Sequence, residues 1–286
     1  MTWKTACPAG VAAIQLVGMA LAGTALAGQP PSYQASRPVV VPVGSGRLDL
    51  DATLCFWSSA PAWHAAVDSG YRADRYGGVA LSYGVADRLE LGLALVPYTY
   101  REDRVGGAPK VSAFGGGSIW VRWAFIDQLA LEVGVGATPA TPSEDPRDQK
   151  AGVRVALPVV WILSPGLLAF HARPDLVTGF AADTFNGGSV LLKFDFDAGF
   201  LLSLANAYLD VTAGVAVQAW PRDPGPTGRE DPLHPTRPAA TFGLKLGWNF
   251  PEGWDLFAAF QFDNLTPATG GRTDQTNLTV GTSYRF

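Results

Sequence analysis

Polar and apolar residues alternate one by one along most of this chain. In the segment 47–57, RLDLDATLCFW, apolar side chains stand at the even positions and polar ones at most of the odd positions. Successive side chains of a β-strand point to opposite faces, so this spacing predicts a strand with one apolar and one polar face. The same pattern predicts twelve strands in all, at residues 47–57, 78–85, 88–95, 118–125, 128–135, 152–161, 167–176, 189–200, 209–217, 241–250, 254–262 and 276–286.

Two kinds of connection join these segments. Five are tight turns, with the sequences VADR, FIDQ, SPG, LANA and FPEGW. An even number of strands, with short turns at one end and longer loops at the other, is typical of antiparallel up-and-down barrels that span a bacterial outer membrane. We therefore predict an all-β transmembrane barrel with short periplasmic turns, longer extracellular loops and both termini on the turn side. The expected loops lie at about residues 58–75, 101–112, 138–149, 180–188, 221–236 and 264–274.

The apolar face of these strands suits lipid better than a protein core. Leu, Val and Phe fill it in nearly every segment, and no charged residue stands in the middle of it. An Arg or Lys there would cost about 2–4 kcal/mol at the bilayer midplane. Aromatic residues gather near segment ends, as at Trp248, Phe250 and Trp254, which is the girdle pattern of membrane barrels. The expected partner of this face is outer-membrane lipid.

The first segment indicates export. Lys4 is followed by an apolar stretch at 11–21 and then by the small-x-small sequence ALA at 25–27. That order is typical of a cleaved secretory peptide. We therefore expect residues 1–27 to be removed and the protein to reach the cell outer membrane.

The remaining chain divides into an arm and a barrel. Residues 28–45 are rich in Pro and Ser and predict an extended periplasmic arm, which leaves 46–286 for the barrel. The arm could plug the lumen, but its sequence favours neither position. Of the two cysteines only Cys55 follows the expected signal peptide, so no intrachain disulfide is predicted. The net charge of −4 and the lack of a basic cluster argue against nucleic-acid binding.

The last strand carries the most specific motif. Its alternation runs to the closing residues Tyr284, Arg285 and Phe286, and such a strand would be a sticky free edge in water. Unpaired backbone groups are too costly in lipid, so we expect this strand to close against the first, near 47–57. The ending resembles the assembly signal of Gram-negative outer-membrane β-barrels. This resemblance implies that Tyr284 and Phe286 engage the barrel-assembly machinery.

A narrower likeness lies in one hairpin. The sequence YGVADRLELGLALVPYTY, at 83–100, resembles the strand–turn–strand of the outer-membrane proteins linked to the meta-pathway of phenol degradation. Those proteins form a family of transporter-like barrels, so the resemblance implies the same kind of barrel here. The match covers about one hairpin.

The polar face of the strands is unusually charged. Charges inside a membrane protein line water or pair with one another. Both signs are interspersed here, which argues against strong ion selectivity, since that needs a ring of one sign. The candidate lumen-lining residues are Arg47, Asp49, Asp51, Glu90, Arg122, Glu132, Arg154, Arg173, Asp175, Lys193, Asp195, Asp197, Lys245, Asp255 and Arg285.

The expected strand number bears on function. Barrels of eight strands are filled by side chains and those of 16–18 leave a channel, so twelve fall between. The favoured function is a narrow polar channel or transporter for small solutes. One alternative is a structural or surface-interaction barrel with a closed, salt-bridged lumen. The other is an outer-membrane lipid-modifying enzyme.

The sequence gives little support for a catalytic site or for a metal site. A nucleophilic site needs a nucleophile, a base and an orienting group within reach. His64 and His234 fall in expected outer loops, and His171 falls on the inner face beside Arg173 and Asp175. No close His/Cys cluster suggests a metal site. We therefore predict no enzymatic activity, no metal and no cofactor.

Two prolines are awkward for this scheme. Pro158 and Pro174 lie inside expected strands, where each removes a ladder donor. A closed barrel has no edge strand to hold them. We expect bulges or local ends of pairing at both.

Overall fold

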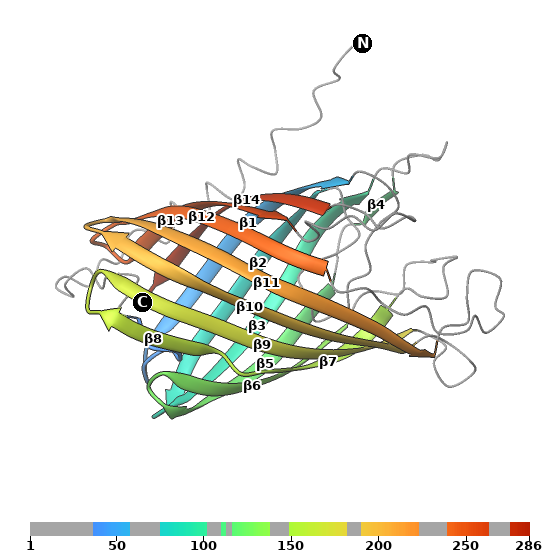
Figure 1. Cartoon of the computed structure of the whole chain (residues 1–286), viewed down its shortest axis with the longest axis horizontal. Coiled ribbons are helices and arrows are strands. Elements are labelled where there is room, and N and C mark those ends of the chain that lie inside the picture. The colour runs from blue at the N-terminus through green and yellow to red at the C-terminus, as the bar shows by residue number, and fades with distance from the viewer. Residues whose placement is uncertain are drawn as a thin grey trace, which may run out of the picture.

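The computed structural model describes residues 37–57, 75–101, 110–112, 116–137, 149–181, 190–222, 239–262 and 275–286. These residues form a closed antiparallel β-barrel of twelve strands, which confirms the predicted fold class. The long strands lie side by side around one axis (Figure 1). The expected signal peptide, 1–27, and the start of the expected arm lie outside the described residues. No helix within these ranges is long and apolar enough to cross a membrane.

Fourteen strand segments account for this barrel. The short β4 pairs only with the end of β3, and β7 and β8 are two parts of one wall strand. The segments are β1 (Gly46–Trp57), β2 (Arg75–Ala86), β3 (Leu89–Arg101), β4 (Lys110–Ser112), β5 (Gly116–Ile126), β6 (Leu129–Ala137), β7 (Gln149–Ala156), β8 (Val159–Ser164), β9 (Leu168–Ala181), β10 (Val190–Leu204), β11 (Ala207–Arg222), β12 (Ala239–Asn249), β13 (Trp254–Phe262) and β14 (Gln275–Arg285).

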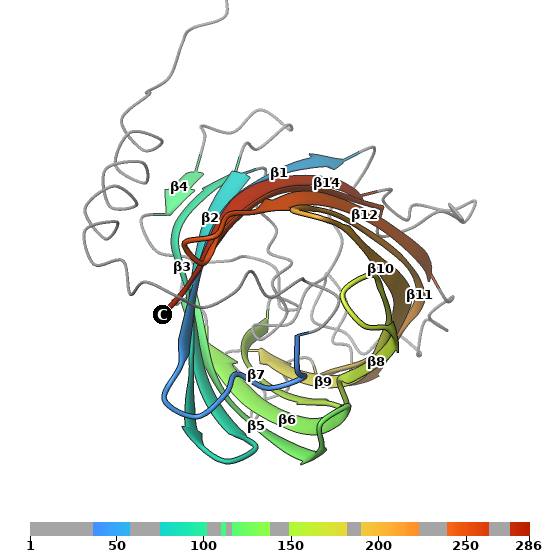
Figure 2. The same ribbon diagram turned by 90° about the vertical axis from the view of Figure 1, so that its left-hand side faces the viewer.

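The barrel closes where its first strand meets its last. β1 pairs antiparallel with β14, from Arg47 opposite Arg285 to Trp57 opposite Gln275. On the other side of the ring β9 pairs with β10, so every wall strand has two neighbours. In Figure 2 the barrel is seen from one end, so that its wall strands appear as a ring. The expected pairing of the last strand with the first is confirmed, and it leaves no free edge to face lipid.

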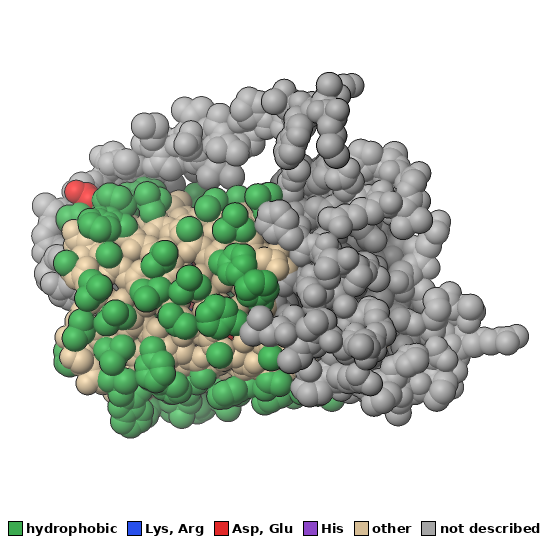
Figure 3. All heavy atoms as spheres, turned by 45° about the horizontal axis from the view of Figure 1, so that its top comes forward, with side chains coloured by type: hydrophobic (Ala, Val, Ile, Leu, Met, Phe, Trp, Pro, Cys, Tyr) green, Lys and Arg blue, Asp and Glu red, His purple; other side chains and the backbone are tan. Residues whose placement is uncertain are grey.

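The outer surface of the wall is apolar. Figure 3 shows hydrophobic side chains spread over the described part of the wall, with no Lys or Arg among them on that face. Trp161, Ile119 and Leu246 are each more than half exposed. Such exposure over a whole surface is far beyond what a soluble monomer shows, because patches there seldom exceed a few hundred Å². The outer wall is therefore suited to a lipid bilayer.

The tight turns lie where the sequence predicted them, and they share one end of the barrel. Two-residue turns stand at Asp87–Arg88, Asp127–Gln128 and Ala205–Asn206, and slightly longer ones at 165–167 and 250–253. Arg88 and Ala205 adopt left-handed backbone, with φ of 65° and 54°. Left-handed positions of this kind match the twist of a hairpin turn to that of its strands. This end of the barrel is called the turn-side mouth below.

Most of the six expected loops lie outside the described residues. One expectation is wrong in part. Residues 101–112 were expected to form a loop, but Lys110–Ser112 form β4, which pairs with Thr99–Arg101 of β3. The segment KVS is too short to show a period of its own, so only its neighbour reveals it as a strand.

The two prolines disturb one seam of the wall. Pro158 lies between β7 and β8, where strand pairing is interrupted as expected. Pro174 stays inside β9, and its register with β10 is unbroken. Leu157 donates its N–H to the Pro174 carbonyl at 3.0 Å, and Pro174 has no N–H to return. The local end of pairing therefore falls on the strand opposite Pro174 rather than on β9 itself.

Candidate functional site: the inner wall and its turn-side mouth

A row of alternating charges crosses the inner wall near the turn-side mouth. Glu90 of β3, Arg122 of β5 and Glu132 of β6 are direct cross-strand partners. Side chains opposite one another on one face of a sheet lie within reach. Arg122 donates from Nη1 to Glu90 at 3.1 Å and from Nη2 to Glu132 at 2.6 Å. These carboxylates are almost fully buried, with side-chain exposures of 1 % for Glu90 and 6 % for Glu132.

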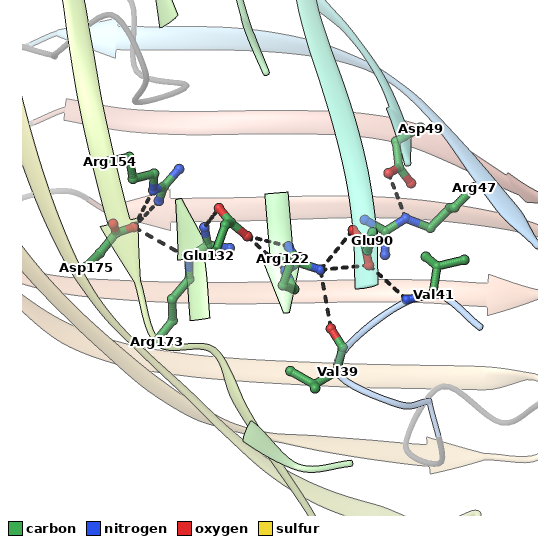
Figure 4. Close-up of polar contacts among 10 residues, drawn as sticks. All are labelled: Val39, Val41, Arg47, Asp49, Glu90, Arg122, Glu132, Arg154, Arg173 and Asp175. Atoms are coloured by element: carbon green, nitrogen blue, oxygen red, sulfur yellow. Dashed lines mark hydrogen bonds and ion pairs between the residues drawn. The ribbon is translucent and has the colours of Figure 1, made fainter. Parts of the chain in front are cut away.

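The row continues onto β9 and β7 (Figure 4). Ala156 separates Glu132 from Asp175 in the register, and Arg173 spans the gap. Arg173 donates to Glu132 at 2.6 Å and lies 3.4 Å from the Asp175 carboxylate. Arg154 also donates to Asp175. We call the six side chains of this row, Glu90, Arg122, Glu132, Arg173, Asp175 and Arg154, the charge ladder.

A second charged group lies at the same mouth, on β13 and β14. The Asp255 carboxylate is 2 % exposed and pairs with Arg285 at 3.0 Å and with Arg37 at 2.8 Å. Arg37 also donates to the side-chain oxygen of Asn249 at 3.1 Å. Burial lowers the pKa of the Arg37 guanidinium, and the charge of Asp255 opposes that shift. Arginine remains charged in proteins, so this contact is an ion pair.

Residues 37–45, called the strap below, enter the turn-side mouth. Val41 donates its N–H to Glu90 at 2.8 Å, and the Val39 carbonyl accepts from Arg122 at 3.3 Å (Figure 4). Val39 and Val40 are buried together with Ala124 and Ala130 of the wall. Figure 2 shows the blue chain before β1 running inward from the ring. The sequence left the position of the expected arm open, and the structure places this part of it inside the barrel.

Two glycines shape the base of the strap. Gly44 has a φ of +77°, which L side chains rarely adopt. Gly84 of β2 lies against Val41 and Pro42 so closely that a Cβ there would strike the Pro42 carbonyl. Gly84 also accepts from the Gly44 N–H at 2.9 Å and donates to Ser45 at 3.0 Å. The strap is thus held to β2 through backbone contacts that need a bare backbone on the wall.

The other charges predicted to line the lumen are not members of the charge ladder, although Arg47 lies beside Glu90 at one end of it (Figure 4). Arg47 donates to Asp49 at 2.8 Å, and Lys193 pairs with Asp195 at 2.8 Å. Each of these two pairs lies along a single strand. Three predicted lumen charges remain. Asp197 accepts from the Thr241 hydroxyl, and the Lys245 ammonium lies over the Phe257 ring. Asp51 forms a hydrogen bond with the Gly78 backbone.

One row of the inner wall alternates side chains with glycines. Its members are cross-strand partners from β11 round to β2, and they read Tyr208, Gly247, Phe257, Gly281, Asp51 and Gly78. A Cβ at Gly247 or Gly281 would strike the neighbouring ring, and one at Gly78 would lie 2.7 Å from the Asp51 carboxylate. The side chains therefore lie along the wall over the glycines. We call these six residues the glycine row.

Sequence reasoning missed the glycine row and the position of the strap. Inward-facing glycines were visible in segments such as 241–250, but their partners depend on the register between strands. The strap has no periodic pattern, and its polar contacts are made by backbone atoms and by the long Arg37 side chain. Neither the glycine row nor the position of the strap can be predicted from the sequence pattern of one strand alone.

The described residues include one histidine that could take part in catalysis. His171 of β9 lies 2.7 Å from the Asp210 carboxylate of β11, and Nε2 is the contacting atom. His64 and His234 lie outside the described residues. Within the described part of the chain, no group of three or more His, Cys, Asp or Glu could hold a metal ion. The expectations of no enzymatic activity and no metal stay predictions.

No protein-family model and no curated protein sequence matches this chain. Solved structures do. An outer-membrane channel from Pseudomonas putida F1 aligns with a TM-score of 0.58 at 14 % identity, over 91 % of this chain and all of that one. The NanC porin aligns with a TM-score of 0.51 at 10 % identity, over 83 % of this chain and 98 % of that one. At these identities the likeness shows the fold, which is that of outer-membrane β-barrels.

Proposed function

We propose that this protein is an outer-membrane channel for small solutes, with a polar lumen that narrows at the turn-side mouth. The observation that carries the proposal is the glycine row. Tyr208, Phe257 and Asp51 lie over glycines of neighbouring strands instead of projecting across the barrel. Side chains that lie along the wall leave room inside a barrel of intermediate size. A barrel designed to be filled would place large side chains at those glycine positions.

The charges of the inner wall support a water-facing lumen. Outside the charge ladder, Arg47 and Asp49 keep 37 % and 22 % of their side chains exposed although both face inward. Charged groups at membrane depth need water or a partner. The mixture of signs favours passage of small polar solutes over strong selection for cations or anions. The two similar solved structures are called a channel and a porin, which agrees with this proposal.

Proteoliposome swelling tests the proposal. The purified barrel is reconstituted into liposomes, which are diluted into isotonic solutions of uncharged solutes of increasing size. We expect swelling with the smallest solutes and a fall in rate as solute size grows, because the lumen is narrow. Liposomes with heat-unfolded protein are the control. Folded, heat-modifiable barrels that leave liposomes as tight as the control would contradict a channel.

A closed, structural barrel is the second candidate. The charge ladder favours it, because each of its carboxylates is paired and nearly all of their surface is covered. Fully paired charges can fill a lumen instead of lining water. The swelling test separates the two, since only the channel admits solutes.

A lipid-modifying enzyme stays the third alternative. His171 with Asp210 supplies a base and an orienting group, and a catalytic nucleophile near them is still needed. Release of fatty acids from outer-membrane lipid, measured for the purified protein and for His171→Ala, tests it. Activity lost in the variant would favour the enzyme.

A further inference from the structure

We propose that the strap is a releasable gate that narrows the turn-side mouth in the described conformation. The inference rests on the proposed channel for its functional meaning, but the release of the strap can be measured without any transport. It follows from three features: where the strap is anchored, what the wall keeps when the strap leaves, and how the strap is hinged.

The strap bridges distant parts of the ring. Its Arg37 end is held by Asp255 of β13, while Val39 and Val41 are held by Arg122 of β5 and Glu90 of β3. Going round the ring from β13 to β3, the chain order passes β14, β1 and β2. In a twelve-strand ring, β3 and β5 are therefore four and five strands away from β13, so the anchors lie on well-separated parts of the mouth. A segment anchored in this way lies over the opening rather than along one strand.

The wall does not need the strap for its charge balance. Glu90 is paired with Arg122, Arg122 with Glu132, and Asp255 with Arg285, all within the barrel. Removing one partner of a buried ion pair is strongly unfavourable when it leaves a charge alone. Departure of the strap leaves no wall carboxylate alone, and the freed Arg37 gains water. This charge arrangement is expected of a segment that can bind to the wall and be released from it.

The apolar contact of the strap is small. Val39 and Val40 pack on Ala124 and Ala130, with Val160 partly buried beside them. The wall residues are mostly alanines, so the strap contributes the larger side chains of this cluster. Loss of the strap exposes two valines and leaves a shallow apolar surface, which is a modest penalty beside that of opening a full core.

The hinge lies at the base of the strap. Gly44 supplies the left-handed turn, and the contact with Gly84 is limited to backbone atoms and one parallel bridge at Val43. β1 begins at Gly46, where it is fixed by pairing with β2 and β14. Motion of the strap therefore stops at Gly44, and the barrel wall need not change when the mouth opens.

Two measurements on one set of variants test the gate. Arg37→Glu places a like charge beside Asp255 and should release the strap, while Arg37→Lys keeps the charge and should hold it. The control is Arg88→Glu, at the same mouth on an exposed turn with Asp127 as its ion-pair partner. In a Cys55→Ser background, Val40→Cys reports strap exposure through its rate of labelling by a water-soluble maleimide. Single-channel recording reports the open mouth.

We expect Arg37→Glu to raise the labelling rate at position 40 roughly tenfold, as expected for loss of a charge-assisted contact, and to raise the open-channel conductance. Arg37→Lys and Arg88→Glu should behave like the parent protein. Equal labelling and equal conductance in Arg37→Glu and its parent would overturn the gate while leaving the channel in place. Faster labelling in a barrel that stays silent in all variants would support the releasable strap and refute the proposed channel.

Discussion

Glu132 illustrates how single residues balance charge on the inner wall. Its two carboxylate oxygens accept from different arginines, Arg122 and Arg173, each at 2.6 Å. A buried carboxylate shared by two guanidinium groups holds both in place. Without it, Arg122 keeps Glu90 and Arg173 keeps only a longer contact to Asp175.

Replacement of Glu132 by Gln should destabilise the barrel by about 3–5 kcal/mol, because it removes a buried carboxylate charge that two partly buried arginines share. Denaturant-induced unfolding in lipid vesicles, followed by the loss of heat-modifiable mobility, measures the effect. The control is Asp127→Asn, whose pair with Arg88 is 3.8 Å long and well exposed. That variant should stay within about 0.5 kcal/mol of the parent. Equal stabilities of the two variants would show that the charge ladder does not contribute to the stability of the barrel.

The face of each charge could be predicted from the sequence, but its partner could not. Parity along a strand places Glu90, Arg122 and Glu132 on the side opposite the leucines and valines. Their pairing depends on how three strands align, and one residue of slip would turn every side chain of a strand to the other face. The role of Arg37 was missed altogether, because the residue lies outside any periodic segment.

At the scale of elements, neighbouring wall strands fit together through side chains that pack over glycines as well as through backbone hydrogen bonds. Gly281 of β14 faces Phe257 of β13 on one side, and on the other the Leu50 carbonyl of β1 would lie 2.8 Å from a Cβ. The Phe257 ring can rotate away from an added methyl group, but the Leu50 carbonyl is fixed in a paired strand and cannot. The glycine row therefore sets how closely these strands approach.

Gly281→Ala should lower the free energy of unfolding by about 1–3 kcal/mol, because the added methyl overpacks a rigid wall. Unfolding in lipid vesicles measures it. Gly77→Ala is a matched control on β2, since the nearest atom to its Cβ would be 3.7 Å away. The control should be nearly neutral. A neutral Gly281→Ala would mean that Phe257 and β1 move aside freely, against the account of a tight glycine row.

The C-terminal residues also act as an element. Tyr284 lies 4.5 Å from the Trp254 ring and stacks on Phe286 at 6.1 Å, on the outer face. The Phe286 ring lies over Gly46, where a Cβ would strike it. These rings close the seam between β1 and β14 at its turn-side end. We propose that the same residues present the last strand to the barrel-assembly machinery.

Tyr284→Ala combined with Phe286→Ala should reduce the amount of barrel inserted in cells several-fold. The reason is that the substitutions remove the exposed apolar face by which the strand is recognised. Quantitative comparison of membrane-inserted and unassembled protein measures it. The purified variant should still fold into lipid vesicles in vitro, because the backbone pairing of β14 with β1 is unchanged. A normal yield in cells would exclude an assembly role for these two rings.

Elements differed in how well the sequence predicted them. The long strands were predictable because each buries one face in lipid and so carries an unbroken period of two. β4 was not, because three residues cannot show a period. The break at Pro158 was predictable from the missing donor, whereas β9 runs through Pro174 because the pairing ends on its neighbour instead.

At the scale of the whole molecule, the barrel is turned inside out relative to a soluble protein. Its large apolar side chains face outward, and its buried groups include Glu90, Asp175 and Asp255. Closure, strand number and the apolar exterior follow from local alternation together with the cost of unpaired backbone in lipid. The arrangement inside the ring does not, because it joins residues from different strands and from the strap.

The central claim is that the inner face of the wall meets water that is continuous across the membrane. Single-channel recording in a planar bilayer at low salt tests it most directly, with Asp51→Lys on the inner face and Leu50→Ala on the outer face of the same strand. We predict reproducible current steps that change in size and ion preference for Asp51→Lys and stay the same for Leu50→Ala, since low salt leaves wall charges unscreened. Silent bilayers with folded protein, or steps indifferent to Asp51→Lys, would contradict the account.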